Sequence, residues 1–84
     1  MKRYIINYDL NIPGKDYGDL ISAITRYPYA KLCKSCWAVN STKTAHQIFT
    51  ELRQHIDDND TLFVCDFSDW SGYIPTDAIE WLNN

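Results

Sequence analysis

The chain has 84 residues, of which 45% are hydrophobic and 14% aromatic, with a formal net charge of −3. This length permits a single domain, and the apolar content excludes an intrinsically disordered chain. No apolar run approaches the roughly 18 residues that a membrane span needs. The three cysteines, an odd number, favour a reducing compartment over a disulfide framework, and no secretory signal pattern opens the sequence. We therefore expect a cytoplasmic protein without membrane association.

The charge is divided unevenly between the two halves of the chain. Residues 1–43 carry seven Lys and Arg against three Asp, a balance of +4, and residues 44–84 carry one Arg against eight Asp and Glu, a balance of −7. Because phosphate binding depends on Lys and Arg, only the first half can supply a basic face for nucleic acid. Such a face would use Lys2, Arg3, Lys15, Arg26, Lys31, Lys34 and Lys43. An ordinary solvated surface is the alternative.

The first predicted element is a strand over residues 3–9 (RYIINYD), which is rich in β-branched and aromatic side chains. The period of two puts Tyr4, Ile6 and Tyr8 on one face, and Ile5, Asn7 and Asp9 on the other. Residues 11–14 (NIPG) then have the chemistry of a turn.

The second element is a helix that begins near Asp16, whose side chain suits the N-cap position. Apolar side chains follow at helical spacing and form one stripe: Tyr17, Leu20, Ile21, Ile24 and Tyr27. Pro28 is expected to end this helix, because a proline restricts the backbone of the residue before it.

Residues 29–39 (YAKLCKSCWAV) fit either one long strand or two short strands with a tight junction near Lys34–Ser35. We favour two strands, because a compact sheet needs two strands between the flanking helices. A second helix then begins after Thr44, which forms a capping box with Gln47. Its apolar face comprises Ala45, Ile48, Phe49, Leu52 and Ile56.

The last full strand is predicted over residues 61–67 (TLFVCDF), and Thr76 is expected to cap a short helix through Leu82. The order β-α-β-β-α-β is that of an α+β, ferredoxin-like domain, with two helices on one face of a four-stranded antiparallel sheet. We assign residues 1–67 to this domain and residues 68–84 to a C-terminal tail. Because the core of so small a domain is marginal, we expect the uncovered sheet face to pack against the tail or a second copy of the chain.

Asp9 is the leading candidate for a functional residue because it is a carboxylate at the end of an apolar strand. Its desolvation is unfavourable unless it is hydrogen-bonded or bound to a cation. Hard divalent ions such as Mg²⁺ take one or two carboxylates and keep several waters. The alternative is an Asp that caps the following turn.

The predicted topology gives Asp9 further neighbours. Because the first strand is central in this fold, its carboxyl end lies beside the amino ends of the third and fourth strands, near Ser35 and residues 58–60. A small acidic site that includes Asp60 and the Ser35 hydroxyl is the functional interpretation. A solvated loop between helix and strand is the alternative interpretation of Asp58 and Asp60.

Cys33 and Cys36 form a C-x-x-C pair, and Cys65 lies alone in the last strand. Such pairs serve redox chemistry where the first cysteine opens a helix, and this sequence predicts strands there. In one continuous strand their odd separation would place them on opposite faces. A zinc site would need two further ligands. We therefore interpret all three as buried structural cysteines, with a redox protein as the weaker alternative.

Two segments resemble the CRISPR-associated Cas-two-like family, which includes virulence-associated protein D toxins and stand-alone SinR-like proteins. In YIINYDLN, the pair Tyr8-Asp9 matches the family's aromatic-Asp pair at the end of the first strand. In LCKSCWAV, Ser35 is followed two residues later by the aromatic Trp37, as in the family. The resemblance covers residues 1–67, and chain length and element order agree with it.

This resemblance implies a ferredoxin-like homodimer packed through its sheets. It implies that Asp9 of each copy meets its symmetry mate and holds one Mg²⁺ or Mn²⁺, as the catalytic and metal-binding residue of an endonuclease acting on RNA or DNA. Tyr8, Ser35 and Asp60 would be its neighbours. The chain departs from the family in offering only three Arg for a DNA-binding surface. The competing hypothesis is a dimeric interaction module without catalysis, which binds a protein partner in a toxin–antitoxin or antiviral defence system.

Overall fold

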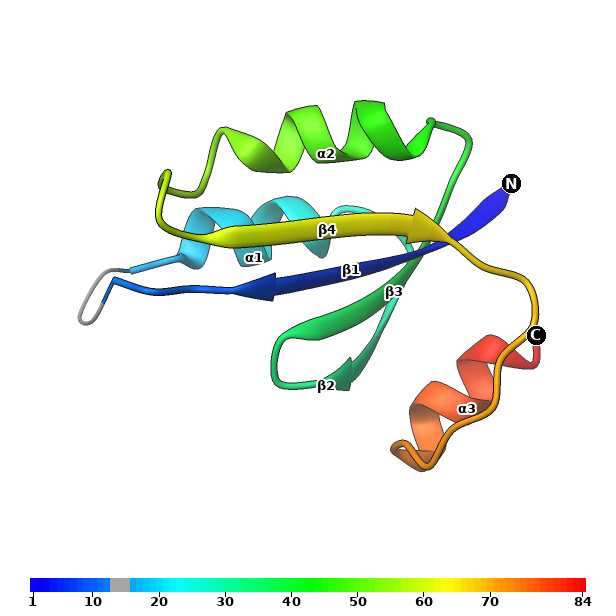
Figure 1. Cartoon of the computed structure of the whole chain (residues 1–84). Coiled ribbons are helices and arrows are strands. Elements are labelled where there is room, and N and C mark those ends of the chain that lie inside the picture. The colour runs from blue at the N-terminus through cyan, green and yellow to red at the C-terminus, as the bar shows by residue number, and fades with distance from the viewer. Residues whose placement is uncertain (13–15) are drawn as a thin grey trace.

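The computed structural model describes residues 1–12 and 16–84 (Figure 1). Its elements are β1 (Lys2–Asp9), α1 (Gly18–Ile24), β2 (Tyr29–Cys33), β3 (Cys36–Ser41), α2 (Ala45–Arg53), β4 (Thr61–Asp66) and α3 (Thr76–Leu82). Lys15 and part of the predicted turn at residues 11–14 lie outside the described residues.

The four strands form one antiparallel sheet in the order β2-β3-β1-β4. β1 is central and pairs with β3 on one side and with β4 on the other. α1 and α2 lie together on one face of this sheet, and α3 lies on the opposite side (Figure 1). This arrangement confirms the α+β, ferredoxin-like fold that the sequence predicted.

β2 and β3 form a hairpin joined by the two-residue turn Lys34–Ser35, so the preferred interpretation of two short strands is correct. The register has one irregularity in β2, because Lys31 is opposite Trp37 whereas Cys33 is opposite Cys36. One extra residue therefore lies between Lys31 and Cys33, which is the pattern of a β-bulge. Because directly opposed residues share a face, Cys33 and Cys36 lie on the same face of the sheet.

The core lies between the sheet and the helices α1 and α2. Its buried members are Tyr4, Ile6, Tyr8, Leu20, Ala23, Ile24, Trp37, Val39, Ile48 and Leu52. The predicted alternation of β1 is confirmed, because every second side chain from Tyr4 to Tyr8 is buried. The Tyr8 hydroxyl is satisfied inside the core, where it accepts a hydrogen bond of 3.0 Å from Trp37 Nε1.

The start of α1 differs in detail from the prediction. The helix begins at Gly18 with Tyr17 at the N-cap position, so Asp16 is not the N-cap residue. Asp16 nevertheless supplies an acceptor for a backbone N–H group at the start of the helix, because its Oδ1 accepts a hydrogen bond of 2.8 Å from Gly18 N. The helix ends at Ile24, before Pro28 is reached, and the proline marks only the outer limit of the turn into β2.

α2 begins with the capping box that the sequence predicted. Thr44 Oγ1 accepts a hydrogen bond of 3.1 Å from Gln47 N, and Gln47 Oε1 accepts one of 2.8 Å from Thr44 N. Ile48 and Leu52 are fully buried on the apolar face. The helix ends at Arg53, so Ile56 packs against the core from the following loop rather than from the helix.

Replacing Thr44 with alanine is expected to lower the free energy of unfolding by about 1 kcal/mol, because Gln47 N loses its acceptor at the helix start. Thr44→Ser keeps the hydroxyl and should retain most of the stability. Urea denaturation measures both variants, with the exposed Thr42→Ala as the control. A Thr44→Ala protein as stable as the unmodified chain would contradict the role given to the capping box.

The C-terminal tail folds back over part of the sheet face that α1 and α2 leave uncovered. α3 packs against β2, and its Ala78 and Leu82 are buried. Thr76 is the first residue of this helix and Pro75 occupies the N-cap position, so Thr76 is not the cap. No helix within residues 1–12 and 16–84 is long and apolar enough to cross a membrane.

The remainder of that sheet face is called the open face here and carries Asn7, Asp9, Cys36, Phe63 and Cys65. Their common orientation follows from the register, in which Asn7 is opposite Cys36 and Phe63, and Ile5 is opposite Cys65. The Phe63 side chain is 58% exposed. The open face therefore combines an exposed aromatic ring, an exposed carboxylate and two half-buried thiols.

Candidate functional site around Asp9

Asp9 is the last residue of β1, exposed to solvent and opposite Thr61 in β4. Within residues 1–12 and 16–84, its carboxylate makes no hydrogen bond and no ion pair. The Asp9 side chain therefore caps no described residue of the turn that follows. Its position at the end of the central strand leaves the carboxylate available to a cation or a second molecule.

Ser35 lies beside the end of β1, as the topology predicted. Its carbonyl oxygen accepts a hydrogen bond of 3.1 Å from Tyr8 N, which joins the β2–β3 turn to the strand that ends at Asp9. Tyr8 itself does not accompany Asp9, because successive side chains of a strand point to opposite faces. Its ring is in the core and its hydroxyl is bound to Trp37. The structure therefore brings the Ser35 backbone to the end of β1, whereas the Tyr8 side chain lies in the core.

Asp60 has a structural role that the sequence did not reveal. Its Oδ1 accepts hydrogen bonds from Asn11 N at 2.8 Å and from the Tyr17 hydroxyl at 3.0 Å, and its Oδ2 accepts one from Asp57 N at 2.8 Å. These bonds join the segment after β1, the start of α1 and the loop before β4. Asp58 is paired with Arg53 at 2.5 Å. Asp60 lies close to the end of β1, and its oxygens are already occupied by donors of the chain.

Among the described residues at the end of β1, Asp9 is the carboxylate that a metal ion could bind, because the Asp60 oxygens accept hydrogen bonds from the chain. Among the described residues, no group of three or more His, Cys, Asp and Glu side chains is arranged to hold a metal ion. The Asp9 oxygens are hard donors of the kind that Mg²⁺ and Mn²⁺ take, and these ions accept as few as one or two carboxylates. Asp9 therefore fits such an ion chemically but supplies only part of a site.

Several basic side chains of the first half are held by interactions within the chain. Lys43 Nζ donates to Glu51 Oε2 at 2.8 Å, and the Tyr27 hydroxyl donates to Glu51 Oε1 at 2.7 Å. The hydrogen bond from Lys43 holds the pKa of Glu51 below its usual value, and the same bond raises the pKa of Lys43. Lys34 is exposed in the turn beside Ser35, and this turn is bonded to the end of β1.

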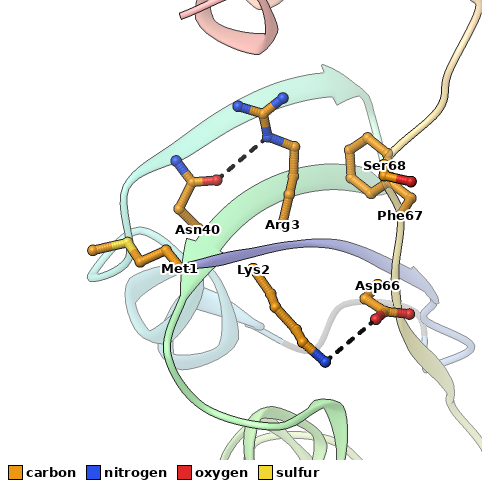
Figure 2. Close-up of a pocket in the computed structure, with 7 residues that line it drawn as sticks. All are labelled: Met1, Lys2, Arg3, Asn40, Asp66, Phe67 and Ser68. Atoms are coloured by element: carbon orange, nitrogen blue, oxygen red, sulfur yellow. Dashed lines mark hydrogen bonds and ion pairs between the residues drawn. The ribbon is translucent and has the colours of Figure 1, made fainter.

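A groove of about 640 Å³ lies at the other end of the sheet (Figure 2). It is lined by Met1, Lys2, Arg3, Asn40, Asp66, Phe67 and Ser68. Lys2 Nζ lies 3.8 Å from Asp66 Oδ2, and Arg3 Nε donates to Asn40 Oδ1 at 3.4 Å (Figure 2). Strand geometry places this end of β1 about 20 Å from Asp9, so the groove is separate from the Asp9 region. Sequence analysis missed it because its lining comes from three segments without a shared motif.

Comparisons with known proteins found no match: no family model, no curated protein and no solved structure matches the chain. The fold therefore rests on the observed topology, and the function on the chemistry of individual residues.

Proposed function

We propose that this protein is a homodimer that acts on nucleic acid as a metal-dependent phosphodiesterase, with Asp9 of both copies in one shared site. The observation that carries the proposal is the exposed Asp9 carboxylate on the open face, at the end of the central strand and without a partner in the described residues. The proposed reaction, metal-dependent cleavage of a phosphodiester, follows from the resemblance of the Tyr8-Asp9 pair to the Cas-two-like family.

A second copy is required because one chain contributes one carboxylate. The exposed Phe63 ring gives the open face an apolar contact that a second copy would cover. Packing of two open faces would bring the ends of the two β1 strands together. Two carboxylates at short distance repel each other, and a cation between them removes that repulsion.

Mg²⁺ or Mn²⁺ would be held by the paired Asp9 carboxylates and, when bound, would supply positive charge that stabilises the transition state of phosphodiester hydrolysis. Lys34, exposed beside the end of β1, is positioned to attract the phosphate backbone to this region.

The test is a cleavage assay on labelled single-stranded and duplex RNA and DNA, with Mg²⁺, with Mn²⁺ and with EDTA. We expect metal-dependent cleavage that falls about 10²–10³-fold in Asp9→Asn, the size of effect seen when one group that stabilises charge in the transition state is lost. Asp66→Asn is the matched control, because Asp66 is also an exposed strand carboxylate but lies at the other end of the sheet. Equal cleavage by Asp9→Asn and the unmodified protein would assign the activity to another site or a contaminant.

Light scattering on the same samples tests the dimer. A monomer at the concentrations of the assay would exclude a site built from two Asp9 side chains. We also expect Phe63→Asp to shift the protein toward the monomer, because it places a charge within the proposed contact.

The second candidate is a non-catalytic dimeric module that binds a protein partner. The observation that favours it is the excess of acidic residues in the second half of the chain, which opposes binding to phosphates. A dimer that cleaves no nucleic acid under any of these conditions would support this candidate over the phosphodiesterase.

A further inference from the structure

Cys33 and Cys36 face each other across the tip of the β2–β3 hairpin. They are opposite in the strand register, and only the turn Lys34–Ser35 separates them in the chain. Cys33 is exposed, and Cys36 and Cys65 are half-buried, so the prediction of three buried cysteines is wrong. The bulge in β2 is the physical reason, because it turns Cys33 to the face of Cys36 at a surface turn rather than into the core.

The register gives this pair the geometry of a disulfide. Opposed residues of antiparallel strands have Cα atoms about 4.5–5.5 Å apart. Disulfides bridge residues whose Cα atoms are about 4.4–6.8 Å apart. The Cα separation expected from the register is therefore within the range that disulfides bridge.

Cys65 is excluded from the same bond by the sheet. It lies in β4, whereas Cys36 lies in β3, and β1 runs between these strands. Two strand spacings amount to about 9.6 Å, which is beyond the reach of a disulfide. The tip of the hairpin therefore holds one bridgeable pair, and β4 holds one separate thiol.

We propose that Cys33 and Cys36 form a reversible disulfide across the hairpin turn by exchange with a low-molecular-weight disulfide of the glutathione class. The proposed bond involves neither Asp9 nor a residue of a second copy, although Cys36 lies on the open face that the proposed dimer would cover.

Exposure assigns the order of the two steps. The Cys33 thiolate attacks one sulfur of the small disulfide, whose S–S bond breaks, and one small thiol is released. Cys36 then loses its proton to solvent and attacks the Cys33 sulfur, and the second small thiol leaves. In total, two protein thiols are oxidised to one disulfide, and the small disulfide is reduced to two thiols.

The resolving step is the slow one. Burial, followed by the neighbouring Cys33 and the more distant Cys65, raises the pKa of the Cys36 thiol to about 11 in the reduced pair. In the mixed disulfide Cys33 carries no thiolate, and burial, the largest cause, still holds the pKa of Cys36 above its usual value. Since the thiolate is the nucleophile, the Cys33 mixed disulfide should accumulate at neutral pH and resolve faster as the pH rises. The bond would close the turn in which the Ser35 carbonyl binds Tyr8 N, and so it would form directly beside the end of β1.

The experiment incubates the reduced full chain with oxidised glutathione, quenches with acid and alkylates the remaining thiols. Intact mass and peptide mapping then locate each modification. We expect an intramolecular Cys33–Cys36 disulfide that dithiothreitol reverses, with Cys65 alkylated throughout. Resolution of the mixed disulfide should be roughly tenfold faster for each pH unit between pH 7 and 9, because the thiolate fraction of Cys36 rises by that factor.

Three variants complete the test. Cys36→Ser should stop at a persistent mixed disulfide on Cys33, Cys33→Ser should form no intramolecular bond, and Cys65→Ser should behave as the unmodified chain. Circular dichroism confirms that each is folded. Any of three results would overturn the proposal: a disulfide that involves Cys65, a disulfide between chains, or no oxidation of the pair in excess oxidised glutathione. Protection of both thiols by Zn²⁺ at one ion for two chains would also overturn it, because it would assign the pair to a metal site.

Discussion

Replacing Ile6 with alanine is expected to lower the free energy of unfolding by about 2–5 kcal/mol, the range for truncating a fully buried aliphatic side chain. Ile6 is 0% exposed in the central strand, and its register partners are Trp37 in β3 and Val64 in β4. A domain of this size has a total stability of about 4–13 kcal/mol, so this one change removes a large fraction of it. Urea denaturation followed by circular dichroism measures the loss, and a partly unfolded variant is within expectation.

The matched control is Ile5→Ala, one residue earlier in the same strand. Ile5 points to the opposite face and is only half-buried, so its truncation should lower the free energy of unfolding clearly less than that of Ile6. An equal or larger loss at Ile5 would contradict the assignment of the two faces of β1. Because a shift of one residue in register exchanges the faces, the comparison tests the sheet register directly.

Replacing Arg3 with methionine is expected to release α3 from the sheet. Arg3 Nη1 donates a hydrogen bond of 2.7 Å to the Leu82 carbonyl oxygen, and the guanidinium carbon lies 5.2 Å from the centroid of the Trp81 ring. A cation at the C-terminal end of a helix is favourable, and a hydrogen bond from a charged group contributes about 1.5–3 kcal/mol. Methionine keeps the apolar stem of the side chain and removes both interactions. We expect a stability loss of this size and faster amide hydrogen exchange in residues 76–82.

Lys2→Met is the control for Arg3→Met. Lys2 is the neighbouring residue, and its only described ion pair is an exposed one, 3.8 Å from Asp66. Exposed pairs contribute little to stability, so this variant should retain the protection of α3. Unchanged hydrogen exchange of α3 in Arg3→Met would show that apolar contacts alone hold the tail.

The candidate site was only partly predictable from the sequence. Asp9 stood out because a carboxylate ends an apolar strand, and its exposure on the open face agrees with the predicted alternation. Ser35 and Asp60 were expected near it from the topology. The Ser35 carbonyl accepts from Tyr8 N and the Asp60 carboxylate accepts from Asn11 N, so both segments lie at the end of β1. That Asp60 is occupied by donors from Asn11, Tyr17 and Asp57 could not be foreseen, because those bonds join segments far apart in the sequence.

The sequence by itself determined the elements with strong local signals. The alternation in β1, the capping box at Thr44 and the apolar face of α2 all act within a few residues, and the order of elements then favoured the ferredoxin-like sheet. Tertiary structure alone decided the bulge that brings Cys33 opposite Cys36, and the Arg3 contact that holds α3 on the sheet. Each of these depends on strand register or on residues distant in the sequence, and neither leaves a local pattern. The open face is the combined result, because β-strand periodicity defines its residues and the docked tail decides how much of it stays exposed.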